Sequence, residues 1–172
     1  MDGLVKKIVG ACLSSQEQWL TQTFDKCLFI SRNRGANTAD YGFEWCIQTA
    51  FSEFLFNKQK ELKISEITIG QEDSENRKRY DITFTYNDLQ VIIELKTSSK
   101  GGTSGVKTDM KKEYPSKKNV GGRYFLLFCY PFDNDKKMDI PDADLLDSEI
   151  THCKFRYFLY KDKNRSMPCA GI

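Results

Sequence analysis

The stretch YDITFTYNDLQVIIELKTSS, residues 80–99, decides the fold. Apolar and polar residues alternate through it, and the dipeptide Asn87-Asp88 stands in the middle, where it would form the two-residue turn of a β-hairpin. Counting outward from this turn places Asp81 opposite Glu94. One face of the hairpin is then almost wholly apolar and is expected to face the core, while Asp81, Glu94 and Lys96 share the other face.

These charges allow two interpretations. An antiparallel hairpin with one solvated face carries its charged residues there, so Asp81, Glu94 and Lys96 could simply form that face. Two carboxylates on facing strands, however, have Cβ atoms about 5 Å apart and repel each other unless a proton or a cation lies between them. Mg²⁺ fits this position, since one or two carboxylates suffice to bind it and water and substrate phosphate complete its shell. Lys96 could then reach a substrate oxygen or the attacking water.

A helix is expected from about residue 41, because apolar residues recur at the spacing of one helix face. Thr38 or Asp40 is available to cap it. On the helical circumference Glu44 borders the apolar stripe, so its side chain is expected to point toward Asp81 and Glu94. The stripe consists of Phe43, Cys46, Ile47, Ala50, Phe51, Phe54 and Leu55.

The segments around the hairpin suggest an α/β core. Residues 63–70 are predicted to be a strand, a helix is expected over about 106–114 with Pro115 ending it, and the apolar residues 123–130 predict a further strand. With the earlier helix and the hairpin, the order is α-β-β-β-α-β.

The chain of 172 residues is expected to form a single domain. It divides into an N-terminal helical segment (1–36), the core (40–130) and a C-terminal part (131–172). The C-terminal part consists of an acidic loop over 133–149, an aromatic strand over 153–161 and a tail.

Asp81, a turn, and then Glu94-Leu95-Lys96 at the end of an apolar strand, preceded by a helix with Glu44, resemble the PD-(D/E)xK or restriction-endonuclease-like nuclease superfamily. The resemblance covers about residues 40–130 and includes the element order, while Tyr80 stands where the family name has proline. It implies a restriction-endonuclease-like core, a central mixed β-sheet flanked by helices, here with an extra N-terminal helical segment.

The same resemblance implies a metal-dependent nuclease that hydrolyses phosphodiester bonds, with a DNA endonuclease of restriction or repair type as the leading expectation. It assigns Asp81 and Glu94 to the binding of Mg²⁺, for which Mn²⁺ substitutes. Lys96 would orient or activate the attacking water, and Glu44 would be the accessory helical carboxylate. The products would carry 5′-phosphate and 3′-hydroxyl ends, and a homodimer or a larger nuclease complex stays open.

Charge is unevenly distributed along a chain whose net charge is only +2. Residues 96–123 hold eight lysines and arginines against two acidic residues, which suits nucleic acid as the partner. Lys107 and Lys111 share a helix face and could contact phosphates on either side of the bond that is cut, although a solvated lysine face is the alternative. The other candidate contacts are Lys100, Lys112, Arg32 and Arg34.

Composition excludes several other classes. The sequence shows no apolar run of about 18 residues and no continuous signal-peptide core, so neither a membrane partner nor secretion is expected. The six cysteines lie far apart without a C-x-x-C pair, and His152 is the only histidine, which excludes zinc-finger spacing. The cysteines could form disulfides, but four lie in apolar segments, and free thiols in a reducing, cytoplasmic location fit them better.

Two other functions stay open. The same fold could serve as a non-catalytic nucleic-acid-binding or assembly subunit, for which the basic stretch would matter and the carboxylates would not. Alternatively, the acidic loop 133–149 and the aromatic C-terminal strand could form the surface of a protein-interaction domain. The complete set of Asp81, Glu94 and Lys96 argues against the first, and early elution from heparin would indicate the second.

Overall fold

The computed structural model describes residues 1–23, 38–70, 79–98, 104–111, 119–129, 140, 142–150 and 156–163. Residues 17–23 are helical. The other elements, in chain order, are α1 (Asp2–Ser15), α3 (Thr38–Leu62), β1 (Ser65–Ile69), β2 (Ile82–Tyr86), β3 (Leu89–Ser98), α4 (Ser104–Met110), β4 (Val120–Cys129), β5 (Ala143–Ile150) and β6 (Arg156–Asp162).

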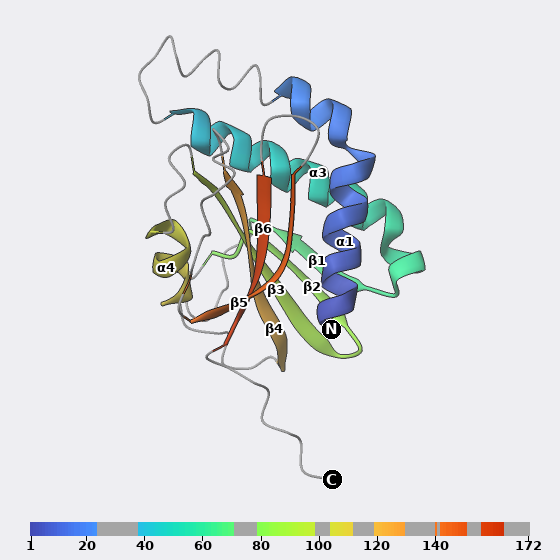
Figure 1. Cartoon of the computed structure of the whole chain (residues 1–172). Coiled ribbons are helices and arrows are strands. Elements are labelled where there is room, and N and C mark those ends of the chain that lie inside the picture. Colours follow the sequence, from blue (N-terminus) through green and yellow to red (C-terminus); the bar gives the residue numbers. More distant parts are fainter. Residues whose placement is uncertain are drawn as a thin grey trace.

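The strands form one mixed sheet with helices on both of its faces, an α/β fold (Figure 1). The strand order is β1-β2-β3-β4-β6-β5. Strands β3 and β4 are parallel and are connected through α4, whereas every other neighbouring pair is antiparallel. Helices α1 and α3 pack on one face of the sheet and α4 on the other. In the part of the chain described, no helix is long and apolar enough to cross a membrane.

The register predicted for the hairpin is confirmed. Tyr86 pairs with Leu89 and Ile82 with Ile93, so β2 and β3 are joined by a two-residue turn. The turn residues Asn87 and Asp88 have φ angles of +49° and +59°, the left-handed conformation that a type I′ hairpin turn requires and that Asn and Asp tolerate better than most residues.

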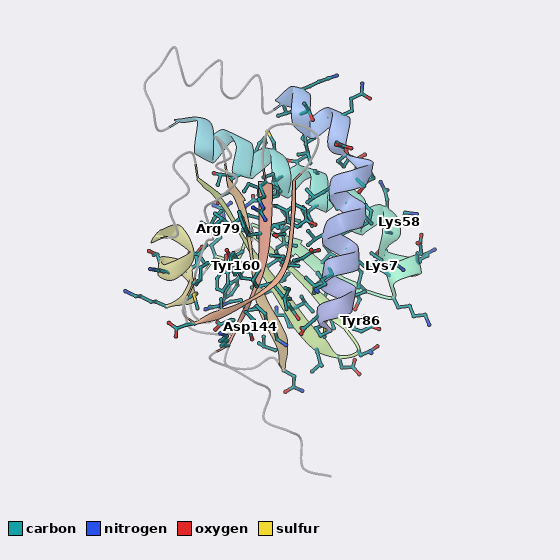
Figure 2. All side chains as sticks on the ribbon, in the orientation of Figure 1. Lys7, Lys58, Arg79, Tyr86, Asp144 and Tyr160 are labelled. Carbon is teal, nitrogen blue, oxygen red and sulfur yellow. The ribbon has the colours of Figure 1, made fainter. Side chains whose placement is uncertain are left out.

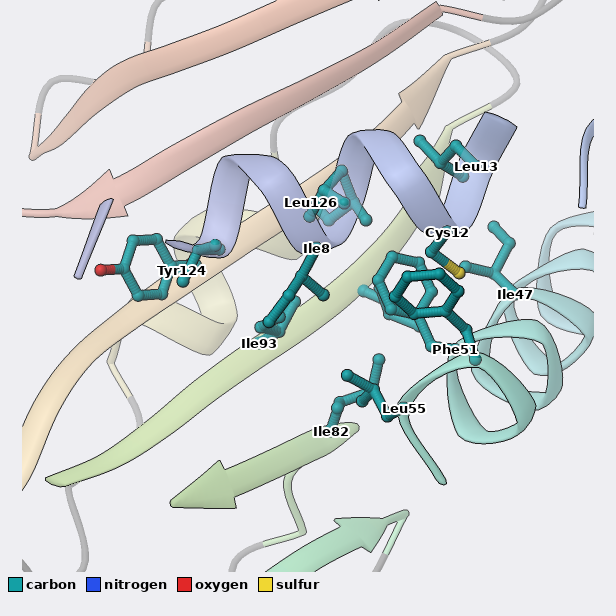
Figure 3. Close-up of a cluster of buried hydrophobic side chains, with 14 of the residues drawn as sticks. Ile8, Cys12, Leu13, Ile47, Phe51, Leu55, Ile82, Ile93, Tyr124 and Leu126 are labelled. Atoms are coloured by element: carbon teal, nitrogen blue, oxygen red, sulfur yellow. The ribbon is translucent and has the colours of Figure 1, made fainter. Parts of the chain in front are cut away.

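The apolar face of the hairpin lies in the main core, as predicted. Ile82 and Ile93 pack there with the apolar stripe of α3, including Phe51 and Leu55, and with Ile8 of α1 (Figure 3). All five of these side chains are fully buried. The predicted helix around Glu44 and its inward-facing stripe are therefore confirmed, with Phe43 outside the residues whose side chains are described.

The other face of the hairpin is not the solvated face of the simpler interpretation. Glu94 has 0% of its surface exposed, and Thr83 and Ile92 on the same side are buried too. Strands β3 and β4 are parallel, so the chain must cross over the sheet between them. Helix α4 lies in this crossover and covers the face that carries Glu94. Between α4 and this face of the sheet lies a second core, which consists of Val106, Phe125, Leu127, Ile140, Ala143, Phe158 and Tyr160.

A buried ion pair fastens α4 to the sheet. Arg123 of β4 donates from Nη2 to the backbone oxygen of Met110 at 2.7 Å, and the same nitrogen lies 3.0 Å from Oδ2 of Asp162. Both charged side chains are almost completely buried. Arg123 belongs to the basic stretch of the sequence, but its burial excludes it from the surface that could meet nucleic acid.

The bounds of several elements differ from the sequence-based expectation. Helix α3 already begins at Thr38, so Thr38 and Asp40 lie within the helix and not before it. Helix α4 begins at Ser104 and ends at Met110, whereas the sequence predicts a helix over 106–114, and residues 112–118 lie outside the described part. The prediction of an acidic loop over residues 133–149 is wrong in its second half, because residues Ala143–Ile150 form strand β5. Strand β5 is the edge strand of the sheet, and charged side chains are common on edge strands, so its acidic residues gave no strand signal in the sequence.

Candidate active site

The amino group of Lys96 lies among three carboxylates that come from three separate segments. Its Nζ atom is 2.8 Å from Oδ2 of Asp109 in α4 and 3.4 Å from Oε1 of Glu44 in α3. Oδ2 of Asp81, the residue before β2, is 3.9 Å away. All four side chains are largely covered, with 7% to 21% of each exposed. Helix α3, helix α4 and the hairpin therefore meet in one charged cluster.

Asp81 is held by hydrogen bonds to both of its carboxylate oxygens. Nε2 of Gln48 donates to Oδ1 at 2.8 Å, and the backbone N–H of Leu95 donates to Oδ2 at 2.7 Å. The register explains the second contact, because Ile82 pairs with Ile93 and Asp81 therefore comes alongside the next residues of β3. The fold itself fixes the direction of this carboxylate.

Glu94 lies on the same face of β3 as Lys96 and is fully buried. It stands beside Phe125 of β4, and extending the hairpin register by one residue places it level with Asp81. A buried carboxylate needs a proton, a charged partner or a metal ion to compensate for its lost hydration. Glu94 therefore adds a buried carboxyl group beside the cluster around Lys96.

The charge state of Lys96 follows from its neighbours. Burial alone would lower the pKa of Lys96, but the combined attraction of Glu44, Asp109 and Asp81 outweighs burial, and the pKa lies above its ordinary value. The amine therefore stays protonated at neutral pH. It can donate hydrogen bonds but has no lone pair with which to accept a proton.

For Glu44, the effect of burial on the pKa is larger than the opposing attraction of Lys96. Burial raises the pKa of Glu44 above its ordinary value of 4.5; Lys96 opposes this shift, and the negative charges of Asp81 and Asp109 add to it. Glu44 is therefore harder to deprotonate than a solvated glutamic acid. Its proton is held more tightly in the folded protein than in the unfolded chain.

The variant Glu44→Gln tests this environment through the pH dependence of stability. Because folded Glu44 binds its proton more tightly, the parent protein should lose stability relative to the variant as the pH rises from 4.5 through the raised pKa. Above that range the difference should stay constant. Urea unfolding of both proteins in metal-free buffer, from about pH 4 to pH 8, measures the effect. Parallel stability curves would contradict it.

The donors of the cluster fit Mg²⁺. Within the described ranges, no three His, Cys, Asp or Glu side chains are placed so that they could hold a metal ion. Mg²⁺ does not need such a group, because it keeps several waters and is bound through one or two carboxylates. An ionised carboxylate has about four lone-pair positions, and Asp81 uses two for Gln48 and Leu95. Asp81 can therefore still offer an oxygen ligand.

The structure brings the predicted core of the site together. Contacts join Glu44 and Asp81 to Lys96, and Glu94 lies two residues before Lys96 on the same face of β3. Among the predicted nucleic-acid contacts, Lys107 and Lys111 are both exposed, but α4 ends at Met110, so the prediction that they share a helix face is wrong. The remaining candidates lie outside the described residues: Lys100, Lys112, Arg32 and Arg34.

Two polar residues of the cluster were not predicted. Gln48 follows Glu44 by one helical turn, so both lie on the same side of α3. Asp109 follows the buried Val106 by three residues and therefore lies on the inner side of α4. Helical spacing places Gln48 beside Glu44 and Asp109 on the inner side of its helix. It does not show that residues of α3 and α4 come together at Lys96 of β3.

The aromatic residues of β6 do not form a surface. Tyr157, Phe158 and Tyr160 are between 1% and 4% exposed, and Tyr160 lies within the sheet region (Figure 2). Of the cysteines with described side chains, Cys12 and Cys46 are free thiols.

Comparisons of the chain with family models, with curated proteins and with solved structures gave no match.

Proposed function

We propose that this protein is a metal-dependent nuclease with a restriction-endonuclease-like core, and that it hydrolyses phosphodiester bonds of DNA. The observation that carries the proposal is the meeting of Lys96 with Glu44 and Asp81 where α3 and the β2–β3 hairpin come together. Residues of these types, in this order and on these elements, are similar to those of the PD-(D/E)xK superfamily. The order of helices and strands from α3 to β4 supports the same core.

Hydrolysis requires a water molecule to attack phosphorus in line with the leaving oxygen while negative charge gathers on the phosphate. Asp81 and Glu94 would hold Mg²⁺, which when bound lowers the pKa of a water ligand and neutralises charge on the phosphate. The donors from Gln48 and Leu95 keep the Asp81 carboxylate in one orientation. The ligand is therefore preorganised, and little ordering remains when substrate binds.

Lys96 contributes as a hydrogen-bond donor and a positive charge. Since its amine stays protonated, it can orient the attacking water or stabilise the charge on the phosphate, but it cannot take the proton of that water. The pKa of Glu44 is raised by burial, which makes this carboxylate a stronger proton acceptor than a solvated glutamate. Glu44 would accept the proton at a carboxylate oxygen, directly or through a bound water.

A cleavage assay tests the proposal. Protein freed of metal with a chelator is given Mg²⁺ or Mn²⁺ and mixed with duplex, single-stranded and branched DNA and with RNA. We expect cleavage of DNA that requires the metal and leaves 5′-phosphate ends. A folded protein that cuts none of these substrates would contradict the proposal. Retention on heparin would then indicate a non-catalytic binding subunit, and early elution a protein-interaction domain.

Lys107 of α4 and Lys111, which follows the end of this helix, should set affinity and leave the chemistry unchanged. Replacing Lys107 and Lys111 together with Gln is expected to weaken DNA binding and to flatten its salt dependence, by about 0.9 in the log–log slope for each phosphate that these lysines neutralise in the parent. Binding is measured at several salt concentrations without divalent metal. Lys6 and Lys7, exposed on α1 at the other face of the sheet, give a control with the same change of charge. Equal slopes for both double variants would place the DNA elsewhere.

A further inference from the structure

Asp109 of α4 is the part of the cluster to which the proposed function gives no role. Its carboxylate is the nearest of the three that surround Lys96, at 2.8 Å against 3.4 Å for Glu44 and 3.9 Å for Asp81. Asp109 is only 5% exposed, so it lies beneath α4 and away from the surface that carries Lys107. Its position suits contact with Lys96 and does not suit contact with nucleic acid.

Helix α4 is anchored close to Asp109 on both sides along the chain. Val106, three residues earlier, is fully buried in the second core. Met110, the next residue, has its backbone oxygen bound by the guanidinium group of Arg123, which is paired in turn with Asp162. These contacts satisfy a carbonyl at the end of a short helix and hold it against the sheet. Asp109 therefore presents its carboxylate from a fixed part of the backbone.

We propose that Asp109 is a positioning residue of the candidate active site, which fixes the ammonium group of Lys96. The inference rests on the proposed function and adds α4 to the elements that build the site. A lysine ammonium stands on a flexible four-carbon stem, so its place depends on its partners. Without Asp109, the ammonium would be drawn toward Glu44 and Asp81, where it would compete with the cation for the ligand oxygens of Asp81.

Two variants of Asp109 separate its charge from its position. Asp109→Asn removes the charge, and Asp109→Glu keeps the charge but moves the carboxylate by one methylene group. The control is Asp144→Asn, because Asp144 forms an exposed pair with Lys163 at the edge strand β5 (Figure 2). Folding of each protein is checked by thermal unfolding.

The first measurement follows the ammonium group itself and needs neither metal nor activity. In nuclear magnetic resonance spectra of the metal-free protein, the Lys96 ammonium signal is assigned by its absence in Lys96→Arg. We expect this signal to shift, and its exchange with water to speed up at least about fivefold, in Asp109→Asn; Asp144→Asn should leave it unchanged. A Lys96 signal that stays the same in Asp109→Asn would overturn the proposal. Should Asp109→Asn not fold, the same comparison with Asp109→Glu decides.

The second measurement separates kcat from KM. A misplacement of about 1 Å can lower a rate about 10²-fold, so we expect kcat of Asp109→Asn to fall about 10- to 100-fold with KM within about threefold of the parent. Asp109→Glu should recover part of kcat. A change in KM alone would assign Asp109 to substrate binding and overturn the proposal. If the parent does not cleave any substrate, the proposed function fails, while the resonance of Lys96 still decides whether Asp109 fixes it.

Discussion

Glu94→Gln is expected to abolish metal-dependent cleavage while leaving the fold and DNA binding intact. The substitution keeps the shape of the side chain and removes the negative charge that would hold the cation. Because a bound metal contributes several kcal/mol of transition-state stabilisation, kcat should fall by at least about 10³-fold. Single-turnover cleavage with saturating protein measures this fall. Thermal unfolding in metal-free buffer checks that the variant is folded.

The companion variant Asp81→Asn should also lose cleavage, but with a cost in stability. Asp81 accepts hydrogen bonds from Gln48 and from the backbone of Leu95, and the amide nitrogen of Asn would place a donor against one of these donors. The loss of a hydrogen bond to a charged group costs about 1.5–3 kcal/mol. If both variants cleave like the parent, neither residue binds a catalytic metal. If Glu94→Gln is the less stable of the two, its carboxylate has a structural role.

Lys96→Met is expected to have a large effect on both activity and stability. It removes the positive charge that lies near Glu44, Asp81 and Asp109 and leaves these partly buried carboxylates to repel one another. Removing one partner of a buried ion pair costs about 3–5 kcal/mol, and the 21% exposure of Lys96 places the expected loss at the lower end. Loss of a preorganised donor should lower kcat by about 10²- to 10³-fold.

Divalent metal should partly reverse the instability of Lys96→Met. A divalent cation can replace the missing positive charge, so adding Mg²⁺ or Mn²⁺ should raise the melting temperature of this variant more than that of the parent. Lys96→Arg keeps the charge and is the matched control for stability, while Lys107→Met removes an exposed lysine of α4. Equal metal-induced shifts in the parent and Lys96→Met would argue against a cation site beside Lys96.

The hairpin could be predicted from the sequence because its determinants are local. The alternation of side chains fixes which face is buried, and Asn87-Asp88 fixes the register, so the positions of Asp81 and Glu94 follow by counting. The inward lean of Glu44 followed from helical spacing in the same way. Each of these inferences needed only residues close together in the chain.

The rest of the site depends on contacts between distant segments, which no local pattern encodes. Gln48 reaches Asp81 across 33 positions of the chain. The role of Asp109 required that α4 return across the charged face of the hairpin, which follows from the parallel pairing of β3 and β4. The burial of Glu94 has the same origin. An open edge position likewise allowed β5 to form from a sequence rich in acidic residues.

The hydrogen bond from the backbone of Leu95 to Asp81 has a consequence for how sequence change can affect this site. Side-chain partners such as Gln48 disappear with a single substitution, whereas every residue except proline supplies a backbone N–H. Position 95 can therefore exchange Leu for another apolar residue that fits the core without releasing Asp81. One of the two restraints on the candidate ligand is thus insensitive to the identity of the residue that provides it.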